Sequence, residues 1–305
     1  MELKRILVTG SNGLLGQKLV HKLRQREDIQ LIATSRGENR VKVTEGYIYE
    51  SLDISNQEEV DSVVSKYKPN AIINTAAMTN VDACEEKKEE CWDLNVNAVK
   101  YLVEASEKWN VHFIHLSTDF VFDGEDGPYR EEDSPNPLSY YGKSKLEAEK
   151  IVLNSNTKWS IARTIIVYGI VDDMSRSNIV LWAKGALEKG QTLTIVNDQF
   201  RSPTLAEDLA DGCILIAEKE AEGIFHLSGK DFMSIVELVR RVAEYYKLDA
   251  SYIQEISSSA LNQAAKRPPK TGFVLDKAIN QLGYNPHSFE DGIAILEKQL
   301  TENQT

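Results

Sequence analysis

Residues 3–16 read Leu-Lys-Arg-Ile-Leu-Val-Thr-Gly-Ser-Asn-Gly-Leu-Leu-Gly, and this stretch decides the fold class. Its first part is a short apolar run that ends at a glycine, which is typical of a buried parallel strand. The three glycines then follow the strand and open a segment with leucines at helical spacing. Backbone N–H groups at such a helix N-terminus favour a phosphate. The stretch therefore predicts a dinucleotide site that includes Gly10, Asn12, Gly13, Leu14, Leu15 and Gly16. A plain strand–helix turn is the alternative, but it would need only one glycine.

The rest of the chain extends this unit into an alternating pattern. Further apolar runs predict strands at 29–35, 47–52, 71–74, 112–117 and 161–168, with helices at 14–23, 60–67, 81–109 and 138–153. This alternation predicts an α/β fold with a doubly wound parallel Rossmann sheet. After residue 169 the rhythm loosens, with helices near 178–189, 205–219, 234–246 and 288–300 and strands near 192–196 and 223–227. We expect a dinucleotide-binding domain at 1–168 and a smaller α/β substrate lobe at 169–305, partly interleaved with it.

The composition excludes several classes of protein. The chain has 305 residues and a net charge of −12, which disfavours general nucleic-acid binding. It contains neither a signal-peptide core nor an apolar run near the ~20 residues of a membrane span. Cys84 and Cys91 lie seven apart in a predicted helix, about 10.5 Å along the axis, which is too far for a disulfide. No Cys/His cluster has zinc spacing, so we predict no metal site, although a need for a divalent ion stays open. These features favour a cytoplasmic, soluble protein without nucleic-acid or membrane partners.

A second motif supplies candidate chemistry. Tyr141 and Lys145 are four residues apart on a predicted helix, so both side chains project from one face. A phenol with a pKa near ~10 is a poor acid or base at neutral pH, and a neighbouring ammonium should lower that pKa. Protonation of an alkoxide as a carbonyl is reduced requires this chemistry. The alternative is an exposed helical tyrosine, because such a pair is common by chance.

The end of the second predicted strand bears on the choice of cofactor. NAD-selective sites usually carry Asp or Glu there, whereas this chain reads Thr34-Ser35-Arg36. Arg36 could pair with a 2′-phosphate or could be a solvated loop residue. We therefore expect NADP(H), with NAD(H) as the alternative. After the third strand, Asp53 could bond the adenine edge, with Ile54 beside it, or Asp53 could cap the next helix.

The motifs together resemble the extended short-chain dehydrogenase/reductases and, more specifically, the dTDP-4-dehydrorhamnose reductase family. The resemblance covers nearly the whole chain. It rests on the glycine turn, Asn74-Thr-Ala76-Ala77, Asn80-Val81-Asp82, the run Ser-Thr-Asp-Phe-Val-Phe-Asp-Gly at 117–124, Pro-Leu-Ser-Tyr-Tyr-Gly-Lys-Ser-Lys at 137–145, Asp-Gln-Phe-Arg-Ser-Pro-Thr at 198–204, Gly223-Ile-Phe-His226 and Arg267-Pro268.

The resemblance implies an activity and residue roles. The activity would be NADPH-dependent reduction of the 4-keto group of a dTDP-sugar, dTDP-4-dehydro-L-rhamnose to dTDP-L-rhamnose, for cell-surface polysaccharide. Tyr141 would donate the proton, Thr118 would hold the substrate carbonyl, Lys145 would bind the nicotinamide ribose, and Asn95 would complete a proton relay. Ala76 and Ala77 would line the cofactor, and Asp119 and Val121 would face the sugar.

Charged groups of the substrate need cationic partners. Arg163, Lys184, Arg201 and Arg267 are the candidates for the diphosphate, and Arg267 is preferred because Pro268 and Pro269 restrain its loop. Arg201 stands where the family often has glycine, so it could meet a diphosphate or narrow the pocket. Thr271 stands where the family usually has serine. Both departures bear on the exact nucleotide-sugar.

Two other functions remain alternatives. A nucleotide-sugar epimerase or dehydratase of the same superfamily is one, although dehydratases usually place an Asp-Glu pair after the Ser/Thr and this chain has Asp119-Phe120. The other is a non-catalytic NADP-binding regulatory subunit, which the methionine adenosyltransferase β-subunit exemplifies. Analogy with related enzymes also suggests a homodimer.

Overall fold

The core of the protein is one parallel sheet. The structure is a computed structural model that describes residues 3–173, 178–261 and 263–302. Within those residues, seven parallel strands follow the order β11-β6-β5-β4-β1-β2-β3. They are β1 (Lys4–Thr9), β2 (Ile29–Ser35), β3 (Ile48–Ser51), β4 (Ala71–Asn74), β5 (His112–Thr118), β6 (Trp159–Thr164) and β11 (Gly223–His226). The predicted doubly wound sheet is confirmed, and its order reverses between β1 and β4, where ligands bind in such folds.

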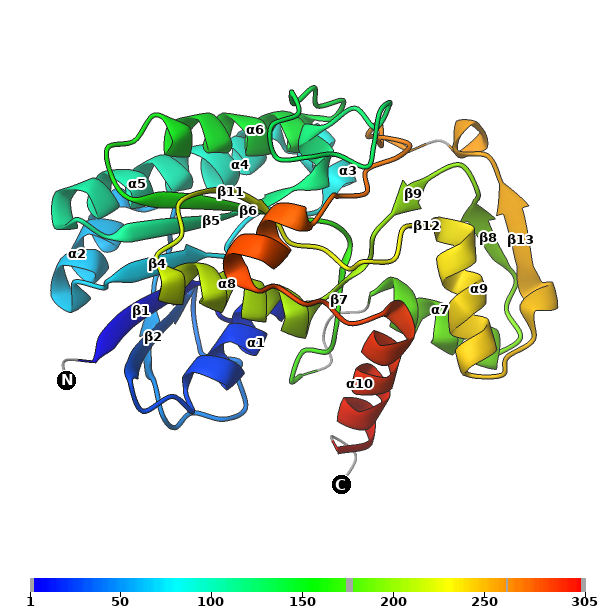
Figure 1. The fold of residues 1–305 in the computed structure, drawn as a ribbon, viewed down its shortest axis with the longest axis horizontal. Helices are drawn as coiled ribbons and strands as arrows, with labels where there is room; N and C mark the ends of the chain where they lie inside the picture. Colours follow the sequence, from blue (N-terminus) through cyan, green and yellow to red (C-terminus); the bar gives the residue numbers. More distant parts are fainter. Residues whose placement is uncertain (1–2, 174–177, 262, 303–305) are drawn as a thin grey trace.

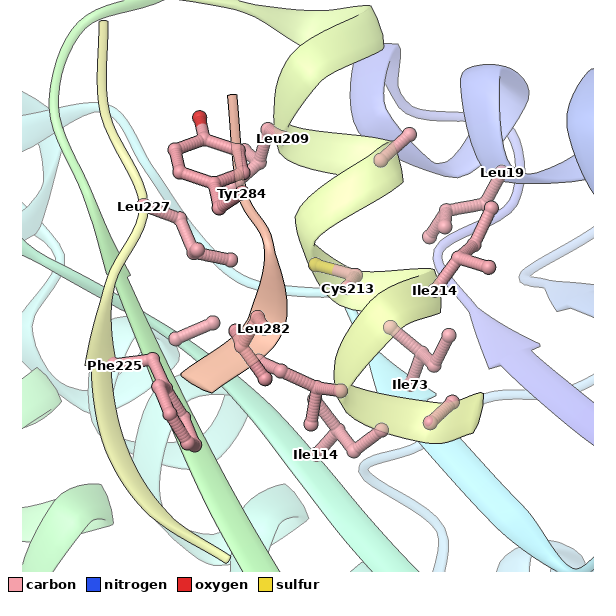
Figure 2. Packing of buried hydrophobic residues seen from close by; sticks show 14 of the residues in the cluster. Leu19, Ile73, Ile114, Leu209, Cys213, Ile214, Phe225, Leu227, Leu282 and Tyr284 are labelled. Atoms are coloured by element: carbon pink, nitrogen blue, oxygen red, sulfur yellow. The ribbon is translucent and has the colours of Figure 1, made fainter. Parts of the chain in front are cut away.

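Helices cover both faces of this sheet (Figure 1). One face carries α1 (Leu14–Leu23) and α8 (Ala206–Lys219), and the other carries α2 (Gln57–Tyr67), α5 (Ala98–Trp109) and α6 (Tyr140–Leu153). Alternate residues of each strand point to opposite faces, so Ile6 and Val8 pack in one core and Leu7 packs in the other. Figure 2 shows part of the first core, in which Cys213 and Ile214 of α8 belong to the same buried cluster as Ile73 and Ile114 of the sheet, and Leu209 lies beside Tyr284. Burial on both faces explains why the strands read as continuous apolar runs.

A second lobe stands beside the sheet and has its own core. Its helices are α7 (Ile179–Glu188), α9 (Ile235–Tyr245) and α10 (Phe289–Glu302). Short strand pairs join them: β8 (Leu193–Val196) with β13 (Ile253–Ile256), β9 (Phe200–Arg201) with β12 (Met233–Ser234), and β7 (Val167–Tyr168) with β10 (Thr204–Leu205). Expected strand 161–168 is thus two strands, because Ile166 takes a φ of 30° and breaks the run.

The chain crosses back to the first sheet after it has entered the second lobe. We expected residues 223–227 to belong to the smaller lobe, but β11 pairs with β6 at the edge of the large sheet. The helix that precedes β11 in the chain, α8, packs on α1. Sequence pattern identifies a strand but does not say which neighbour it will pair with. The division at residue 168 stays a prediction, and the interleaving of the two parts is extensive.

The predicted single helix at 81–109 is wrong. The segment consists of α3 (Val81–Glu86), α4 (Lys88–Trp92), a π-helical turn (Asp93–Asn97) and α5. Lys87 leaves helical geometry, with φ −116° and ψ 61°. Because the two cysteines are not on one continuous helix, the expected separation along a helix axis does not apply. Cys84 and Cys91 lie in one buried cluster with Tyr141, and both are free thiols.

A buried ion pair fixes α6 on the sheet. Arg163 of β6 donates to both carboxylate oxygens of Glu149 on α6, at 2.9 Å and 2.7 Å, and the two side chains are 2% and 0% exposed. Bidentate geometry of this kind is the strong form of the interaction. Arg163 was expected as a diphosphate candidate, but this pair occupies its guanidinium.

We predict that Arg163→Met lowers the free energy of unfolding by about 3–5 kcal/mol, because it leaves the Glu149 carboxylate buried and unpaired. The double variant Arg163→Met/Glu149→Leu should recover most of that loss. Denaturant unfolding measures both. The control is Lys158→Met, which removes an exposed ion pair with Glu220 and should change stability by less than about 1 kcal/mol. Equal losses in the Arg163 and Lys158 variants would contradict the prediction.

Candidate active site

A cavity of about 670 Å³ opens at the carboxyl ends of the strands. The loops after β1, β2, β3 and β4, the ends of β5 and β6, and the first turns of α6 all contribute to it. Every residue predicted to bind the dinucleotide lies in its lining: Gly10, Asn12, Gly13, Leu14, Leu15, Gly16, Arg36, Asp53, Ile54, Ala76, Ala77, Tyr141 and Lys145. Residues as far apart in the sequence as Gly10 and Lys145 therefore meet at one edge of the sheet.

The glycine turn after β1 is packed too closely against neighbouring backbone to admit a side chain at Gly10 or Gly16. Gly10 has a φ of +68°, and a Cβ on it would lie 2.8 Å from the Ala76 backbone nitrogen. A Cβ on Gly16 would lie 2.2 Å from the Gly10 carbonyl oxygen. Gly13 is the N-cap of α1 and supplies no side-chain cap. The turn thus brings the N-terminus of α1 to the cavity without a capping side chain, as a pyrophosphate requires.

The far end of the cavity carries positive charge. Arg36 is 76% exposed and its guanidinium lies 3.9 Å from the Asp53 carboxylate. Arg40, which the sequence did not single out, lies in the lining beside it. Asp53 accepts hydrogen bonds from the Ser55 backbone and hydroxyl, and Asn56 caps α2, so Asp53 is not the helix cap. Two arginines and no acidic strand end fit a phosphorylated ribose better than a bare one.

Tyr141 and Lys145 share the buried face of α6. Ser139 caps the helix by accepting a hydrogen bond from the Gly142 amide, and both functional side chains line the cavity. They are 7% and 3% exposed. The Lys145 ammonium donates to the Leu116 carbonyl at 2.6 Å and lies 3.1 Å from His115 Nε2. Thr118, at the end of β5, lines the same cavity.

The electrostatics differ from the simple expectation for a Tyr–Lys pair. Burial raises the pKa of the Tyr141 phenol, and a hydrogen bond with the Thr118 hydroxyl opposes that rise. Burial lowers the pKa of Lys145 to about 8, and the nearby Glu149 carboxylate counteracts it. The phenol is therefore protonated at neutral pH, which is the form that can donate a proton.

Asp119 joins three distant segments below the cavity. Its carboxylate accepts from the Thr118 hydroxyl at 3.0 Å and from the Thr271 hydroxyl, and it lies 3.5 Å from Arg201 Nε. Burial raises the pKa of the Asp119 carboxyl, whereas Arg201 and the two hydroxyls oppose the shift. Asp119 lines the cavity, and its expected contact with the sugar stays a prediction. The Thr118 hydroxyl thus donates to Asp119 and accepts from the Phe120 amide, which leaves one lone pair for another group.

Four cationic candidates have protein partners. Arg201 is 2% exposed and also donates to the carbonyls of Phe200, Pro268 and Pro269, so it is absent from the cavity lining. Arg267 binds Asp82, with its shortest contact at 2.6 Å. Lys184 pairs with Glu188 one helical turn away. With Arg163 held by Glu149, the structure places these four cations outside the lining of the described cavity.

Two other expected residues lie behind the cavity. Val121 is fully buried in the core on the α8 side of the sheet, because the 3-10 turn Asp119–Val121 directs it inward. Asn95 is on the π-helical turn, where its amide bonds both backbone groups of Met78 and the Ser144 hydroxyl. Its role in a proton relay stays a prediction.

Sequence reasoning missed several contributors to the site. His115 was considered only as a metal ligand, yet it contacts Lys145. Arg40 lies four residues beyond Arg36, and Ser117, Thr164 and Asn178 also line the cavity. Position at the end of a predicted parallel strand could have indicated Ser117 and Thr164. Among the residues that the structure describes, no group of three or more His, Cys, Asp or Glu side chains is arranged to hold a metal ion.

Comparison with known proteins identifies relatives along the whole chain. The family described as the RmlD substrate binding domain matches residues 4–302. The dTDP-4-dehydrorhamnose reductase of Aggregatibacter actinomycetemcomitans is 32% identical, over 94% of this chain and 96% of that protein. Methionine adenosyltransferase 2 subunit beta of Danio rerio is 32% identical, over 87% of this chain and 81% of that protein. The Bacillus anthracis dTDP-4-dehydrorhamnose reductase, solved in complex with NADP, is 26% identical with a TM-score of 0.85, over 98% of this chain and all of that one.

We predict that Gly16→Ala disrupts dinucleotide binding. The new methyl group would collide with the Gly10 carbonyl, so the turn must shift away from the shape that presents its N–H groups. We expect at least a tenfold loss of NADPH affinity by fluorescence titration and a stability loss of about 1–3 kcal/mol. Gly185→Ala in α7 is the matched control, since a Cβ there meets nothing within 4 Å. It should keep NADPH affinity, and unaltered affinity in the Gly16 variant would refute the prediction.

Proposed function

The chain belongs to the RmlD substrate-binding-domain family, and on that premise we propose that it is an NADPH-dependent dTDP-4-dehydrorhamnose reductase. It reduces the 4-keto group of dTDP-4-dehydro-L-rhamnose to give dTDP-L-rhamnose, a precursor of cell-surface polysaccharide. One observation carries the proposal: Thr118, Tyr141 and Lys145 line the same cavity as the glycine turn. A proton donor and a dinucleotide cradle therefore share one space.

The cofactor assignment follows from the two ends of the cavity. The glycine turn would hold the pyrophosphate, and a Cβ at Gly10 or Gly16 would collide with the backbone of Ala76 or Gly10 and so distort the turn. Arg36 and Arg40 would hold a 2′-phosphate, and Asp53 and Ile54 would lie beside the adenosine. Ala76 and Ala77 would line the nicotinamide half. NADPH is the preferred cofactor, and NADH remains usable because both carry the pyrophosphate that the glycine turn would hold.

Tyr141, Thr118 and Lys145 divide the remaining chemistry among them. Bound NADPH supplies the hydride for the 4-keto carbon. Tyr141 donates its phenolic proton to the oxygen of that carbonyl, because burial keeps the phenol protonated at neutral pH. Thr118, whose hydroxyl proton is donated to Asp119 in the free protein, would turn that proton to the substrate oxygen and hold it in place. Lys145 contributes positive charge that stabilises the phenolate left behind, and it binds the nicotinamide ribose.

On the substrate side we assign Asp119, which lines the cavity, and Arg267, which lies outside the lining. Asp119 would face the sugar, and its ion pair with Arg201 gives that arginine an effect on the sugar site through Asp119. Arg267, 19% exposed and paired with Asp82, is the candidate for the diphosphate, and binding there would exchange a carboxylate for a phosphate partner. Val121 would support this surface from the core.

A regulatory subunit is the second candidate function. Relatives named methionine adenosyltransferase 2 subunit beta are 30–32% identical to the chain, as close as the reductase relative. Such a role would need the fold and NADP binding without turnover. The presence of Thr118, Tyr141 and Lys145 in one cavity favours the reductase.

The setting of the reaction is also a proposal. Cys84, Cys91 and Cys213 are buried free thiols, which fits a reducing compartment such as the cytoplasm. Among the described residues, the longest apolar helices fall short of what a membrane crossing requires. The charge of −12 argues against a nucleic-acid partner. A homodimer is proposed from analogy alone.

The direct test is NADPH oxidation with dTDP-4-dehydro-L-rhamnose generated in situ, compared with a UDP-linked keto-sugar and with NADH. The proposal expects turnover with the dTDP-sugar and a preference for NADPH. Oxidation with only the UDP compound would overturn the substrate. NADPH binding without any oxidation would favour the regulatory subunit, and a tightly retained NAD after purification would favour an epimerase.

We predict that Tyr141→Phe lowers kcat by about 10²–10⁴-fold, since the proton donor is lost. NADPH affinity should change little, because the ring and the helix remain. Tyr140→Phe is the matched control, one residue earlier on α6 and outside the cavity lining, and should keep near-normal kcat. Steady-state kinetics with a fluorescence titration of NADPH separates the two effects. Near-normal kcat in the Tyr141 variant would remove that residue from the role of donor.

A further inference from the structure

A row of buried polar side chains crosses three adjacent strands of the sheet beneath the site. Thr9 of β1 is in register with Asn74 of β4, which is in register with His115 of β5. The Thr9 hydroxyl lies 2.6 Å from Asn74 Oδ1, and Asn74 Nδ2 lies 3.2 Å from His115 Nδ1. All three residues are at most 1% exposed. Burying a polar group costs free energy unless another protein group forms a hydrogen bond with it, so these three side chains depend on one another.

The row ends at the catalytic helix. His115 Nε2 lies 3.1 Å from Lys145 Nζ, whose other described partner is the Leu116 carbonyl at 2.6 Å. An ammonium has three N–H donors, so these two acceptors leave one donor for the cavity that Lys145 lines. Two fixed acceptors define the direction of that third donor. Both acceptors come from consecutive residues of β5, so the strand sets the position of the charge.

As placed, Asn74 Nδ2 faces His115 Nδ1, and the proton positions in the row become mutually consistent when the amide exchanges its oxygen and nitrogen. Burial, with the nearby Lys145 charge, holds the pKa of His115 well below its usual range, so the ring carries one proton. With Nε2 accepting from the ammonium, that proton is on Nδ1 and needs an acceptor. The Asn74 amide supplies its oxygen after rotation about its last torsion, and the Thr9 hydroxyl can then accept from the amide nitrogen. In this arrangement His115 Nε2 is unprotonated, so it can accept a hydrogen bond from the Lys145 ammonium.

We propose that His115 is a positioning residue that holds the Lys145 ammonium in place through Nε2, with Asn74 and Thr9 fixing its tautomer. The proposal rests on the proposed function for the role of Lys145, and it adds a residue to which neither the family resemblance nor the comparisons assign a task. Loss of the acceptor makes the ammonium easier to deprotonate. Lys145 then loses its charge, and with it its hold on the cofactor ribose, at a lower pH.

Other groups also face Lys145. Tyr141 and Glu149 share its helix, Cys91 approaches from α4, and Arg163 of β6 is bound to Glu149. Glu149 stabilises the ammonium, and Arg163 screens that effect through its ion pair. None of these groups is changed by a substitution at His115, so a shift in the titration of Lys145 reports on the Nε2 acceptor.

The experiment measures NADPH affinity by fluorescence between about pH 7 and about pH 10. Wild-type affinity should fall as Lys145 loses its proton near pH 8, and Lys145→Met should remove this transition. His115→Leu should move its midpoint down by about one pH unit, a tenfold change in the proton equilibrium. His115→Gln, whose amide oxygen reaches the place of Nε2, should restore the wild-type midpoint. His115→Asn is polar but too short, so it should behave like His115→Leu and keeps the test decisive if the leucine variant does not fold.

His112→Leu is the matched control. His112 lies on the same strand, is buried, and bonds the Ser160 hydroxyl at 2.8 Å instead of Lys145. The His112→Leu variant should be less stable than the wild type, but the midpoint of its pH-dependent NADPH affinity should be unchanged. A wild-type midpoint in both His115→Leu and His115→Asn, or an equal shift in His112→Leu, would overturn the proposal, as would a transition that survives in Lys145→Met. Because the readout is binding, its failure is distinguishable from an absence of turnover with the dTDP-sugar.

Discussion

The functional geometry depends on the attachment of α6 to the end of β5. The Lys145 ammonium reaches the Leu116 carbonyl, and this contact fixes how far the helix lies along the strand. The Glu149–Arg163 ion pair holds the next turn of the same helix on β6. Tyr141 then has a defined place, because it is one turn before Lys145 on a helix clamped at two levels. A charged group and a buried ion pair thus do what apolar packing alone could not, since packing tolerates sliding whereas directional bonds do not.

Local signals explain why the central sheet and the dinucleotide cradle could be predicted. Gly10, Gly13 and Gly16 act within one strand–turn–helix unit, so their spacing carries the structural information. The helix at 81–109 failed for the opposite reason. The charged residues 85–90 contain no helix stop signal, but the chain leaves helical geometry at Lys87. Cys84 then contacts the Met78 carbonyl, and Asn95 reaches Ser144 on α6. Tertiary contacts outweighed helical propensity, and no single-sequence pattern reports them.

The charged residues show the same limit more sharply. Four cations were candidates for an anionic substrate, yet two of them, Arg163 and Arg201, are among the most deeply buried side chains. Arg163 pairs with Glu149 on the preceding helix, and Arg201 pairs with Asp119, which belongs to a different sequence motif. Neither pairing is indicated by the sequence around the arginine. Residue type indicates what an arginine can bind, whereas only the fold indicates what it does bind. The contacts of Asp119 show what only the fold reveals, because this one carboxylate joins the end of β5 to the segments that contain Arg201 and Thr271.

The return of the chain through α8 and β11 has a consequence for dividing the protein. A fragment that stopped at residue 168 would expose the apolar surface under Leu209 and Cys213 and would leave β6 as an open edge that invites aggregation. Recombination between relatives must therefore exchange residues 206–227, and the segment 273–284 that packs in the same core, together with the amino-terminal sheet. Exchange of the carboxy-terminal half alone would break these contacts, whichever lobe supplies the sugar specificity.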